Sequence, residues 1–241
     1  MRIPVMQGVI DRSILANYRI DADVMAKNLP APFRPKLVDG YAIGGICLIR
    51  LLRVRPRFIP LPWGIRSENA AHRIAVEWDD EEGTQEGVYI PRRDTDSWMN
   101  AKAGGNIFPG VHHYATFEVD EDGERFSVTM NSKDGSASVH VVGTRTEAIP
   151  DSSVFSSLEE VSTFFERGSL GYSNTHQSGR YDGLELRCVD WKAEALAVEE
   201  VTSSYFEDTS HFPEGSVTFD CALLMREIKH EWHGRKDLCC T

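Results

Sequence analysis

The sequence lacks the features that direct a chain to a membrane or to nucleic acid. It has no apolar run long enough to span a bilayer, and its first residues contain no extended apolar core of the kind that a secretory signal needs. Basic residues are outnumbered, since 26 Lys and Arg stand against 37 Asp and Glu, for a net charge of -11. Nucleic-acid phosphates would repel such a chain. We therefore expect a cytoplasmic protein that binds neither nucleic acid nor a membrane.

Cysteine is scarce and irregularly spaced. The chain has five cysteines, an odd number, and no CxxC pair. This usage is typical of free thiols in a reducing compartment. It favours neither a disulfide framework nor a cysteine-based metal site, and we expect no metal and no cofactor.

The standard catalytic motifs are absent as well. The chain has no P-loop, no GxGxxG, no HExxH and no GxSxG sequence. Any chemistry must then come from unusual polar residues at strand positions.

The length and composition predict one domain. The chain has 241 residues, of which 41% are hydrophobic, enough for a sizeable core. No internal repeat, low-complexity tract or linker is visible. We expect a single domain over residues 1–241, with an ordered core at roughly 8–232 and a C-terminal tail at 233–241.

Two helices and many strands are predicted. Asp21 is a plausible N-cap of a helix that Pro30 and Pro32 end. Residues 157–160 fit a capping box, and Gly168 ends the second helix. Alternation and apolar runs predict strands at 46–54, 72–78, 87–91, 112–119, 125–130, 136–142, 184–191 and 217–225. Such a pattern predicts an α+β, β-rich fold with a mainly antiparallel sheet that closes or folds over, and with helices outside.

The acidic residues are partly clustered. They gather at 79–82 and at 118–122, each time beside a glycine. We interpret both clusters as solvated turns.

The densest group of polar and turn residues is the stretch 89–113, which ends in a His-His pair. It leaves one predicted strand, passes a glycine pair and a Pro-Gly turn, and enters another. Loops of this kind often line a cavity mouth. Because neighbours on a strand face opposite ways, His113 is expected to face the apolar side with Ala115 and Phe117, and His112 to face away. His113 could act as a general acid or base near neutral pH, or be a structural histidine with satisfied hydrogen bonds.

Arg50 is the sharpest single anomaly, because it lies in a strand that is otherwise apolar. A buried arginine needs a partner. The partner is either a carboxylate of this chain, such as Glu68 or Glu77, or the carboxylate of a substrate; the internal salt bridge is the more frequent case. Three further arginines either join the same anion site or are simply exposed at strand ends, namely Arg73, Arg92 and Arg93.

His72 and Tyr172 are weaker candidates. His72 lies on an apolar strand face, near Glu68 in the sequence, while Tyr172 either places its hydroxyl in a pocket or only packs. A metal site built from His72, His112 and His113 is not favoured by any spacing.

Several motifs together resemble a known family. They are LPAPFRP at 29–35, DGYA at 39–42, ENAAHR at 68–73, EGVYI at 86–90, and FF at 164–165 with GYS at 171–173. They resemble a conserved bacterial family of unknown function that is grouped with the acetoacetate decarboxylase-like superfamily, over roughly residues 10–231. The resemblance implies a closed, mainly antiparallel β-barrel with a central cavity and a few peripheral helices.

The resemblance also implies where catalysis would occur. In the decarboxylases a lysine forms a Schiff base with a keto acid, and a neighbouring lysine and desolvation keep its amine neutral. The lysine pair follows a glycine-aromatic-proline turn, and the similar place here, residues 106–113, has no lysine. Lys102 is the only amine nearby, and imidazole cannot form the imine. We therefore do not expect Schiff-base decarboxylation.

The sequence thus predicts a barrel whose arginines bind a small carboxylate-bearing molecule.

 The bound molecule is expected to be a small organic acid. The ligand-binding residues would be Arg50, Arg73, Arg92, His112 and Tyr172, and the acid–base residues Glu68, His72 and His113. A lyase or hydratase-like proton transfer would suit such a site. The alternatives are a non-catalytic binding protein on the same barrel and a chain whose polar residues are only structural; a homo-oligomer is left open.

Overall fold

The computed structural model describes residues 4–59, 64–103 and 109–239. The helices in these ranges are α1 (Ala22–Asn28), α2 (Trp98–Ala103) and α3 (Leu158–Arg167). The strands are β1 (Met6–Asp21), β2 (Arg34–Pro35), β3 (Leu37–Val38), β4 (Tyr41–Pro56), β5 (Ile65–Asp80), β6 (Gly83–Thr95), β7 (His112–Glu121), β8 (Arg125–Ser132), β9 (Ser138–Thr146), β10 (Leu170–Asn174), β11 (Arg180–Cys188), β12 (Glu194–Ser203), β13 (Val217–Gly234) and β14 (Leu238–Cys239). The predicted β-rich fold class is confirmed.

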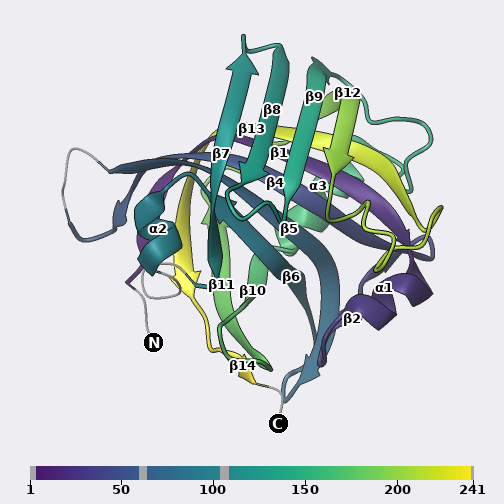
Figure 1. Cartoon of the computed structure of the whole chain (residues 1–241), viewed down its shortest axis with the longest axis horizontal. Helices are drawn as coiled ribbons and strands as arrows, with labels where there is room; N and C mark the ends of the chain where they lie inside the picture. Colours follow the sequence, from purple (N-terminus) through teal and green to yellow (C-terminus); the bar gives the residue numbers. More distant parts are fainter. Residues whose placement is uncertain (1–3, 60–63, 104–108, 240–241) are drawn as a thin grey trace.

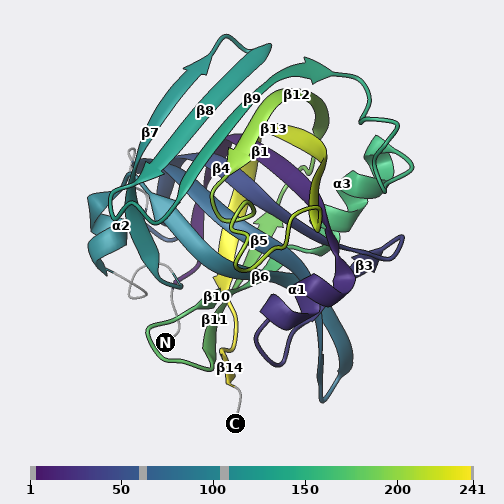
Figure 2. The same cartoon turned by 45° about the vertical axis from the view of Figure 1, so that its right-hand side comes forward.

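Strand pairing closes two rings that share five strands, β13, β1, β4, β5 and β6. The small ring is completed by β10 and β11, which connect β6 back to β13. The large ring is completed by β7, β8, β9 and β12. In Figure 1 these four strands rise above the shared strands, and β10 and β11 lie below them. Figure 2 shows the same four strands as a curved layer over the shared sheet.

The sheet is mainly antiparallel, as predicted. The parallel pairings described both involve β6, which pairs with β10 along one part of its edge and with β7 along the next. The edge of β6 is therefore the place where the two rings part, and residues near that point belong to both.

The shared strands bury both of their faces, which explains why their sequences are apolar on both sides. On β4, Ile46 and Leu48 pack in the core of the large ring, whereas Cys47 and Leu51 pack in the core of the small ring. The predicted doubly covered strand at 46–54 is thus confirmed, and β4 extends beyond it at both ends.

Both predicted helices begin at the expected caps. The Asp21 side chain accepts hydrogen bonds from the backbone N–H groups of Asp23 and Val24, and α1 ends before Pro30. The Ser157 side chain accepts from the N–H of Glu160, and α3 ends at Gly168. The buried residues of α3, Val161 and Phe165, belong to the core of the small ring, so this helix covers that ring.

Other elements differ from the prediction. β1 and β12 are not predicted, and β5 begins at Ile65, before the predicted strand at 72–78. β1 escapes detection because Arg12 and Asn17, both fully buried, interrupt its apolar pattern. Residues 104–108 of the 89–113 stretch lie outside the described residues.

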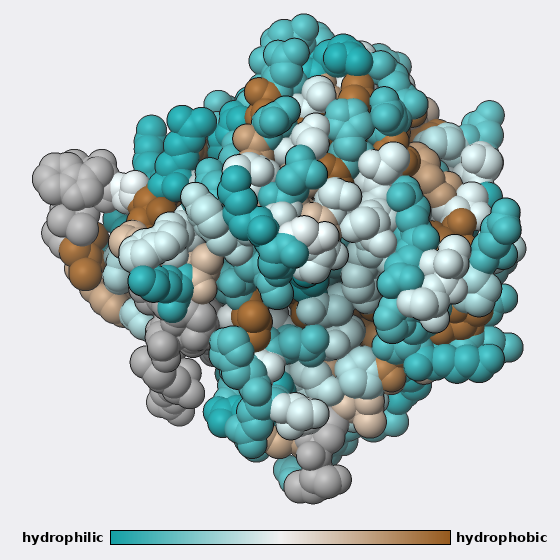
Figure 3. All heavy atoms as spheres, in the orientation of Figure 1, coloured by the Kyte–Doolittle hydropathy of each residue, from teal (hydrophilic) through white to brown (hydrophobic). Residues whose placement is uncertain are grey.

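The outer surface in view is mainly hydrophilic (Figure 3). Figure 3 shows a face covered mainly by hydrophilic side chains, with hydrophobic ones scattered between them. None of the helices in the described ranges is long and apolar enough to cross a membrane.

Candidate ligand-binding site

The small ring encloses a cavity of about 150 Å³. Its walls are mainly apolar and come from the shared strands, from β11 and from the end of α3. They include Val88, Ile90, Phe165, Leu184, Leu186, Trp191 and Trp232. A second cavity of about 60 Å³ shares five of its lining residues with the first, namely Ile49, Ala71, Arg93, Leu184 and Trp232. The two cavities therefore adjoin, and Arg93 lies on the wall of both.

The register of the sheet places two arginines on the face that lines the cavity. Arg93 on β6 lies opposite Ala71 on β5. Arg73 is two residues from Ala71 on the same strand, so it faces the same way and is a diagonal neighbour of Arg93, at about 7–8 Å between Cα atoms. A bulge in this pair of strands lies beside them, between His72 and Ile74, and Pro91, which has no N–H to donate, falls within it.

Arg73 is buried and held by neutral groups. Its Nε donates a hydrogen bond to the Cys47 sulfur at 2.9 Å, and its Nη2 donates to Asn17 Oδ1 at 2.5 Å. The guanidinium also lies over the ring of Phe165, 4.0 Å from its centre. Gly45 makes room for this arrangement, because a Cβ there would lie 2.6 Å from the Ala16 carbonyl oxygen and 3.1 Å from Asn17 Oδ1.

Arg93 has a similar neutral environment. Its Nε donates to the Ser173 hydroxyl at 2.9 Å. Burial lowers the pKa of Arg93 to about 10, and only the interaction with Cys47 opposes that shift. Within the described part of the chain, neither Arg73 nor Arg93 forms an ion pair with a carboxylate.

His112 lies beside Arg93 at the smaller cavity. The two residues are partners in the parallel pairing of β6 and β7, so their side chains share a face. Nδ1 of His112 lies 3.2 Å from the Gly110 carbonyl oxygen, which requires Nδ1 to carry the proton and leaves Nε2 as an acceptor. Burial, followed by the charge of Arg93, lowers the pKa of His112 to about 4. The imidazole is therefore neutral near pH 7.

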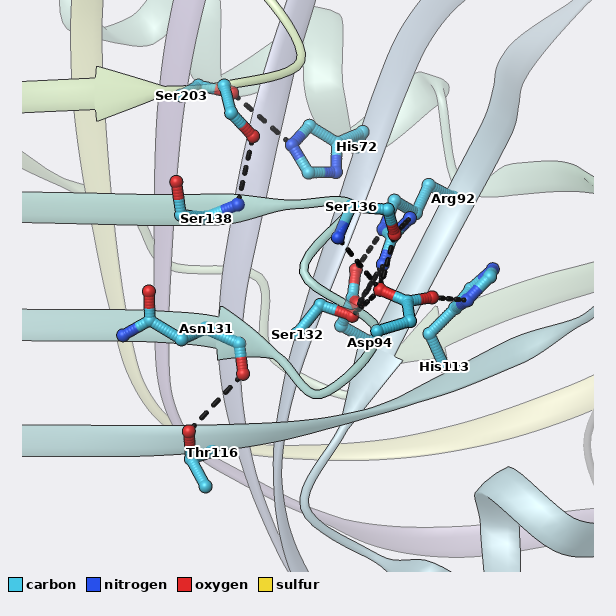
Figure 4. Close-up of polar contacts among 12 residues, drawn as sticks. His72, Arg92, Asp94, His113, Thr116, Asn131, Ser132, Ser136, Ser138 and Ser203 are labelled. Atoms are coloured by element: carbon cyan, nitrogen blue, oxygen red, sulfur yellow. Dashed lines mark hydrogen bonds and ion pairs between the residues drawn. The ribbon is translucent and has the colours of Figure 1, made fainter.

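The expectation that His113 is the inward histidine is wrong for this cavity. His113 faces the other side of β7, where its Nδ1 lies 3.0 Å from Asp134 Oδ2 (Figure 4). The apolar face that alternation detects on β7 belongs to the large ring, whereas the cavity lies in the small ring. The sequence pattern does not distinguish these two interiors.

Arg50 and Glu68 pair with each other instead of lining the cavity. Nε of Arg50 donates to Glu68 at 2.5 Å, so the internal salt bridge is found. Arg12 donates to the same glutamate at 2.6 Å, and both arginines also bond Glu121. Arg50 is thus satisfied by protein carboxylates, and neither cavity includes it among its described lining residues.

Glu121 differs from the interpretation of 118–122 as a solvated turn. Its side chain is 16% exposed because it reaches from the end of β7 to the arginines of β1 and β4. The other acidic residues of that cluster are exposed at the end of the hairpin.

His72 and Arg92 lie on the opposite face from the cavity. His72 is fully buried, with Nε2 at 3.3 Å from the Ser203 hydroxyl. Although Glu68 and His72 share a face of β5, four strand residues separate them by about 13 Å. Arg92 donates two hydrogen bonds to Asp94, both at 2.8 Å, and Figure 4 shows this pair beside Ser132.

Tyr172 also lies away from the cavity. Its hydroxyl donates to the Lys236 carbonyl oxygen at 3.3 Å, and its ring packs edge-on against Trp78. Of the two alternatives for Tyr172, a hydroxyl in a pocket or a side chain that only packs, the structure has the second. The predicted site residues therefore do not form one site: Arg73 and His112 belong to the cavities, and Glu68, His72, His113, Arg50, Arg92 and Tyr172 lie elsewhere.

Two residues of the site carry no recognisable sequence signal. Asn17 orients Arg73 from β1, a strand that the sequence does not predict. Cys47 looks like one more apolar residue in β4. Arg93 is visible in the sequence as a member of the arginine group, but nothing there separates it from Arg92, which faces the other ring.

Buried neutral histidines predict acid sensitivity. Burial lowers the pKa of His72 to about 3 and that of His230 to about 4. The unfolded chain takes up these protons near pH 6.5. The free energy of unfolding should therefore fall as the pH drops from about 6.5 towards the pKa values of the folded state, by about 1 kcal/mol per pH unit for each imidazole. Urea unfolding between pH 7 and pH 4.5 measures this slope.

Two matched variants isolate the contribution of the His72 imidazole to this slope. His72→Gln should reduce the slope, whatever its stability at pH 7, and the exposed His176→Gln should leave it unchanged. An equal slope in His72→Gln and the wild type would contradict the assignment.

The closed strand pairing with a cavity inside it defines an acetoacetate decarboxylase-like fold. The acetoacetate decarboxylase of Legionella pneumophila superposes with a TM-score of 0.62 at 12% identity, over 97% of this chain and 87% of that one. The enduracididine biosynthesis enzyme MppR complexed with pyruvate gives 0.59 at 10% identity, over 99% and 91%. An acetoacetate decarboxylase-like enzyme from Sphingomonas wittichii gives 0.58 at 12% identity, over 100% and 94%. At such identities the likeness shows the fold alone.

The family is shown by the sequence itself. The family model described as an uncharacterized conserved protein, DUF2071, matches residues 10–216, and the chain belongs to that family. No curated protein matches the sequence. The resemblance stated from the sequence motifs is confirmed.

Proposed function

We propose that the chain binds a small carboxylate-bearing molecule in the cavity of the small ring. The observation that carries the proposal is the pair Arg73 and Arg93, two guanidinium groups on one cavity wall without a carboxylate partner in the described part of the chain. Two parallel donors of a guanidinium match the two oxygens of a carboxylate.

The charges of the fold support this assignment. Removing a cation from water is costly unless an anion compensates it. Arg12, Arg50 and Arg92 each have that compensation from a carboxylate of the chain. The hydrogen-bond partners of the two cavity arginines among the described residues are a hydroxyl, an amide and a thiol, so an anionic ligand would supply the missing countercharge.

The catalytic form of the proposal is a proton transfer of the lyase or hydratase type. His112 is neutral and presents Nε2 as an acceptor beside Arg93. Nε2 would take a proton from the carbon next to the ligand carboxylate, and the electron pair of the broken C–H bond would remain on the ligand as an enolate. The two guanidinium groups would stabilise that added negative charge. The neighbour MppR, which is complexed with pyruvate, gives a small acid precedent on this fold.

The second candidate function is non-catalytic binding of the same acid. One observation favours it: among the described residues that line the two cavities there is no lysine, and the single carboxylate, Asp94, is held by Arg92. Lys102 lies instead over the exposed ring of Trp98. Among the described lining residues, His112 then has no amine and no free carboxylate as partner for a reaction that needs both an acid and a base.

A panel of small acids tests the proposal. We expect carboxylates with a compact apolar group to raise the melting temperature, whereas the corresponding amides and alcohols should not, because binding to the folded state stabilises it. The same panel, followed by proton exchange of the carbon-bound hydrogen in D₂O, separates the two candidates. Exchange that disappears in His112→Phe supports catalysis, and binding without exchange supports the non-catalytic function. No stabilisation by any carboxylate would refute the proposed site.

A further inference from the structure

The larger cavity has room and walls for one compact apolar group. Its volume is about 150 Å³, the size at which an apolar cavity in another protein holds a benzene ring. Phe165, Trp191, Leu186 and Trp232 form much of its lining. A single aromatic ring therefore fits this space without rearrangement.

The smaller cavity presents acceptors beside Arg93. Nε2 of His112 is an acceptor because Nδ1 bonds the Gly110 carbonyl. Asn100 is 8% exposed, and its Oδ1 has no hydrogen-bond partner in the described part of the chain. Asn69 uses its amide hydrogens on Ser67 and on the Ile49 carbonyl. A buried acceptor without a donor costs free energy, so this end of the site is complementary to a ligand that donates.

We infer that the ligand is a 2-hydroxy acid with a compact apolar body, an inference that rests on the proposed acid site. Its carboxylate pairs with Arg93 and Arg73, its hydroxyl donates to Asn100 Oδ1, and its body fills the larger cavity. A 2-oxo acid presents only acceptors at the same place and leaves Asn100 unpaired.

Charge excludes the other common donor, the ammonium group of an amino acid. Arg73 and Arg93 already bring two positive charges to the described walls. The one carboxylate there, Asp94, accepts two hydrogen bonds from Arg92. An ammonium group would meet two like charges without a free counterion, whereas a hydroxyl donates without adding charge.

Three acids with the same ring and carboxylate test the inference. Mandelate carries the hydroxyl, phenylglyoxylate carries a keto group, and phenylacetate carries neither. Titration calorimetry with the full chain should show one mandelate enantiomer binding about tenfold more tightly than either other acid, the effect of one hydrogen bond to a buried acceptor. Asn100→Leu should remove that preference and leave the affinity for phenylacetate unchanged, while the exposed Asn131→Leu should change neither.

The outcomes distinguish a failure of the hydroxy-acid inference from a failure of the proposed acid site. If all three acids bind equally, or if phenylglyoxylate binds most tightly, the hydroxy-acid inference fails and the acid site stands. If Asn100→Leu weakens all three acids alike, its role is structural and the inference fails. If none of the three binds, the failure lies with the proposed function itself.

Discussion

Replacing Arg93 with methionine should weaken the binding of small carboxylates by on the order of 10- to 100-fold, the effect of losing a charge-assisted hydrogen bond pair. The same change should leave the chain as stable as the wild type or more stable. Arg93 brings a partly desolvated charge to the cavity wall, and within the described ranges its hydrogen-bond partner is the Ser173 hydroxyl. An apolar side chain of similar length removes that desolvation cost, on the order of 1 kcal/mol in favour of the folded state.

Two matched variants complete this test. Arg93→Lys keeps the charge but loses the two-pronged donor, so it should recover only part of the affinity. Arg66→Met removes an exposed arginine from β5 and should change neither affinity nor stability. Calorimetric titration with phenylacetate gives the affinities, and urea unfolding gives the stabilities. An Arg93→Met chain that is strongly destabilised, or that binds the acid as tightly as the wild type, would contradict the assignment.

Replacing Glu121 with glutamine should have the opposite character, a large loss of stability without a direct effect on the cavity. Arg12 and Arg50 are cross-strand neighbours, and Glu121 with a second glutamate holds these like charges together; Asp11, at 3.5 Å from Arg50, is a third carboxylate. Glu121 pairs with both arginines, whereas among the described ion pairs Asp11 pairs with Arg50 alone, so Asp11 does not replace the contact that Arg12 loses. Breaking a buried ion pair costs about 3–5 kcal/mol, and the compensation that Asp11 gives Arg50 places the expected loss at the lower end, about 3 kcal/mol. Urea unfolding at pH 7 measures the loss, with Glu118→Gln on the exposed side of β7 as the control.

The pH dependence of this cluster has a definite sign. Burial alone would raise the pKa of Glu121, but Arg12 and Arg50 outweigh burial and lower it. A carboxylate with a lowered pKa contributes stability above its ordinary value and loses that contribution as the pH falls through the folded value. Glu121→Gln should therefore flatten the acid part of the stability profile. A loss below about 1 kcal/mol, or an unchanged acid profile, would show that the cluster behaves as an exposed ion pair.

The sequence predicts the fold class because its main signals are local. The caps at Asp21 and Ser157 and the doubly apolar pattern of β4 need no knowledge of distant residues. β1 needs such knowledge, because Arg12 is acceptable in a buried strand only when Glu68 and Glu121 are near it. Those partners are 56 and 109 residues away, and no local pattern indicates them.

The sequence identifies the residue types of the candidate site but not their arrangement. Arginines and histidines within 50–113 are recognisable as unusual, but alternation gives a face and does not say which of two interiors that face meets. Arg92 and Arg93 differ by one position, and so do His112 and His113; in each pair one residue lines the cavity and the other joins the network of the large ring. The stretch 89–113 remains part of the site through Arg93 and His112.

A crystal structure of the chain soaked with phenylacetate tests the central claim most directly. We predict a carboxylate whose oxygens lie within hydrogen-bond distance, about 2.7–3.2 Å, of the guanidinium nitrogens of Arg73 and Arg93, with its ring in the larger cavity against Trp191 and Trp232. An acid bound elsewhere, with the small ring unchanged and both guanidinium groups without a contact to it, would contradict the account.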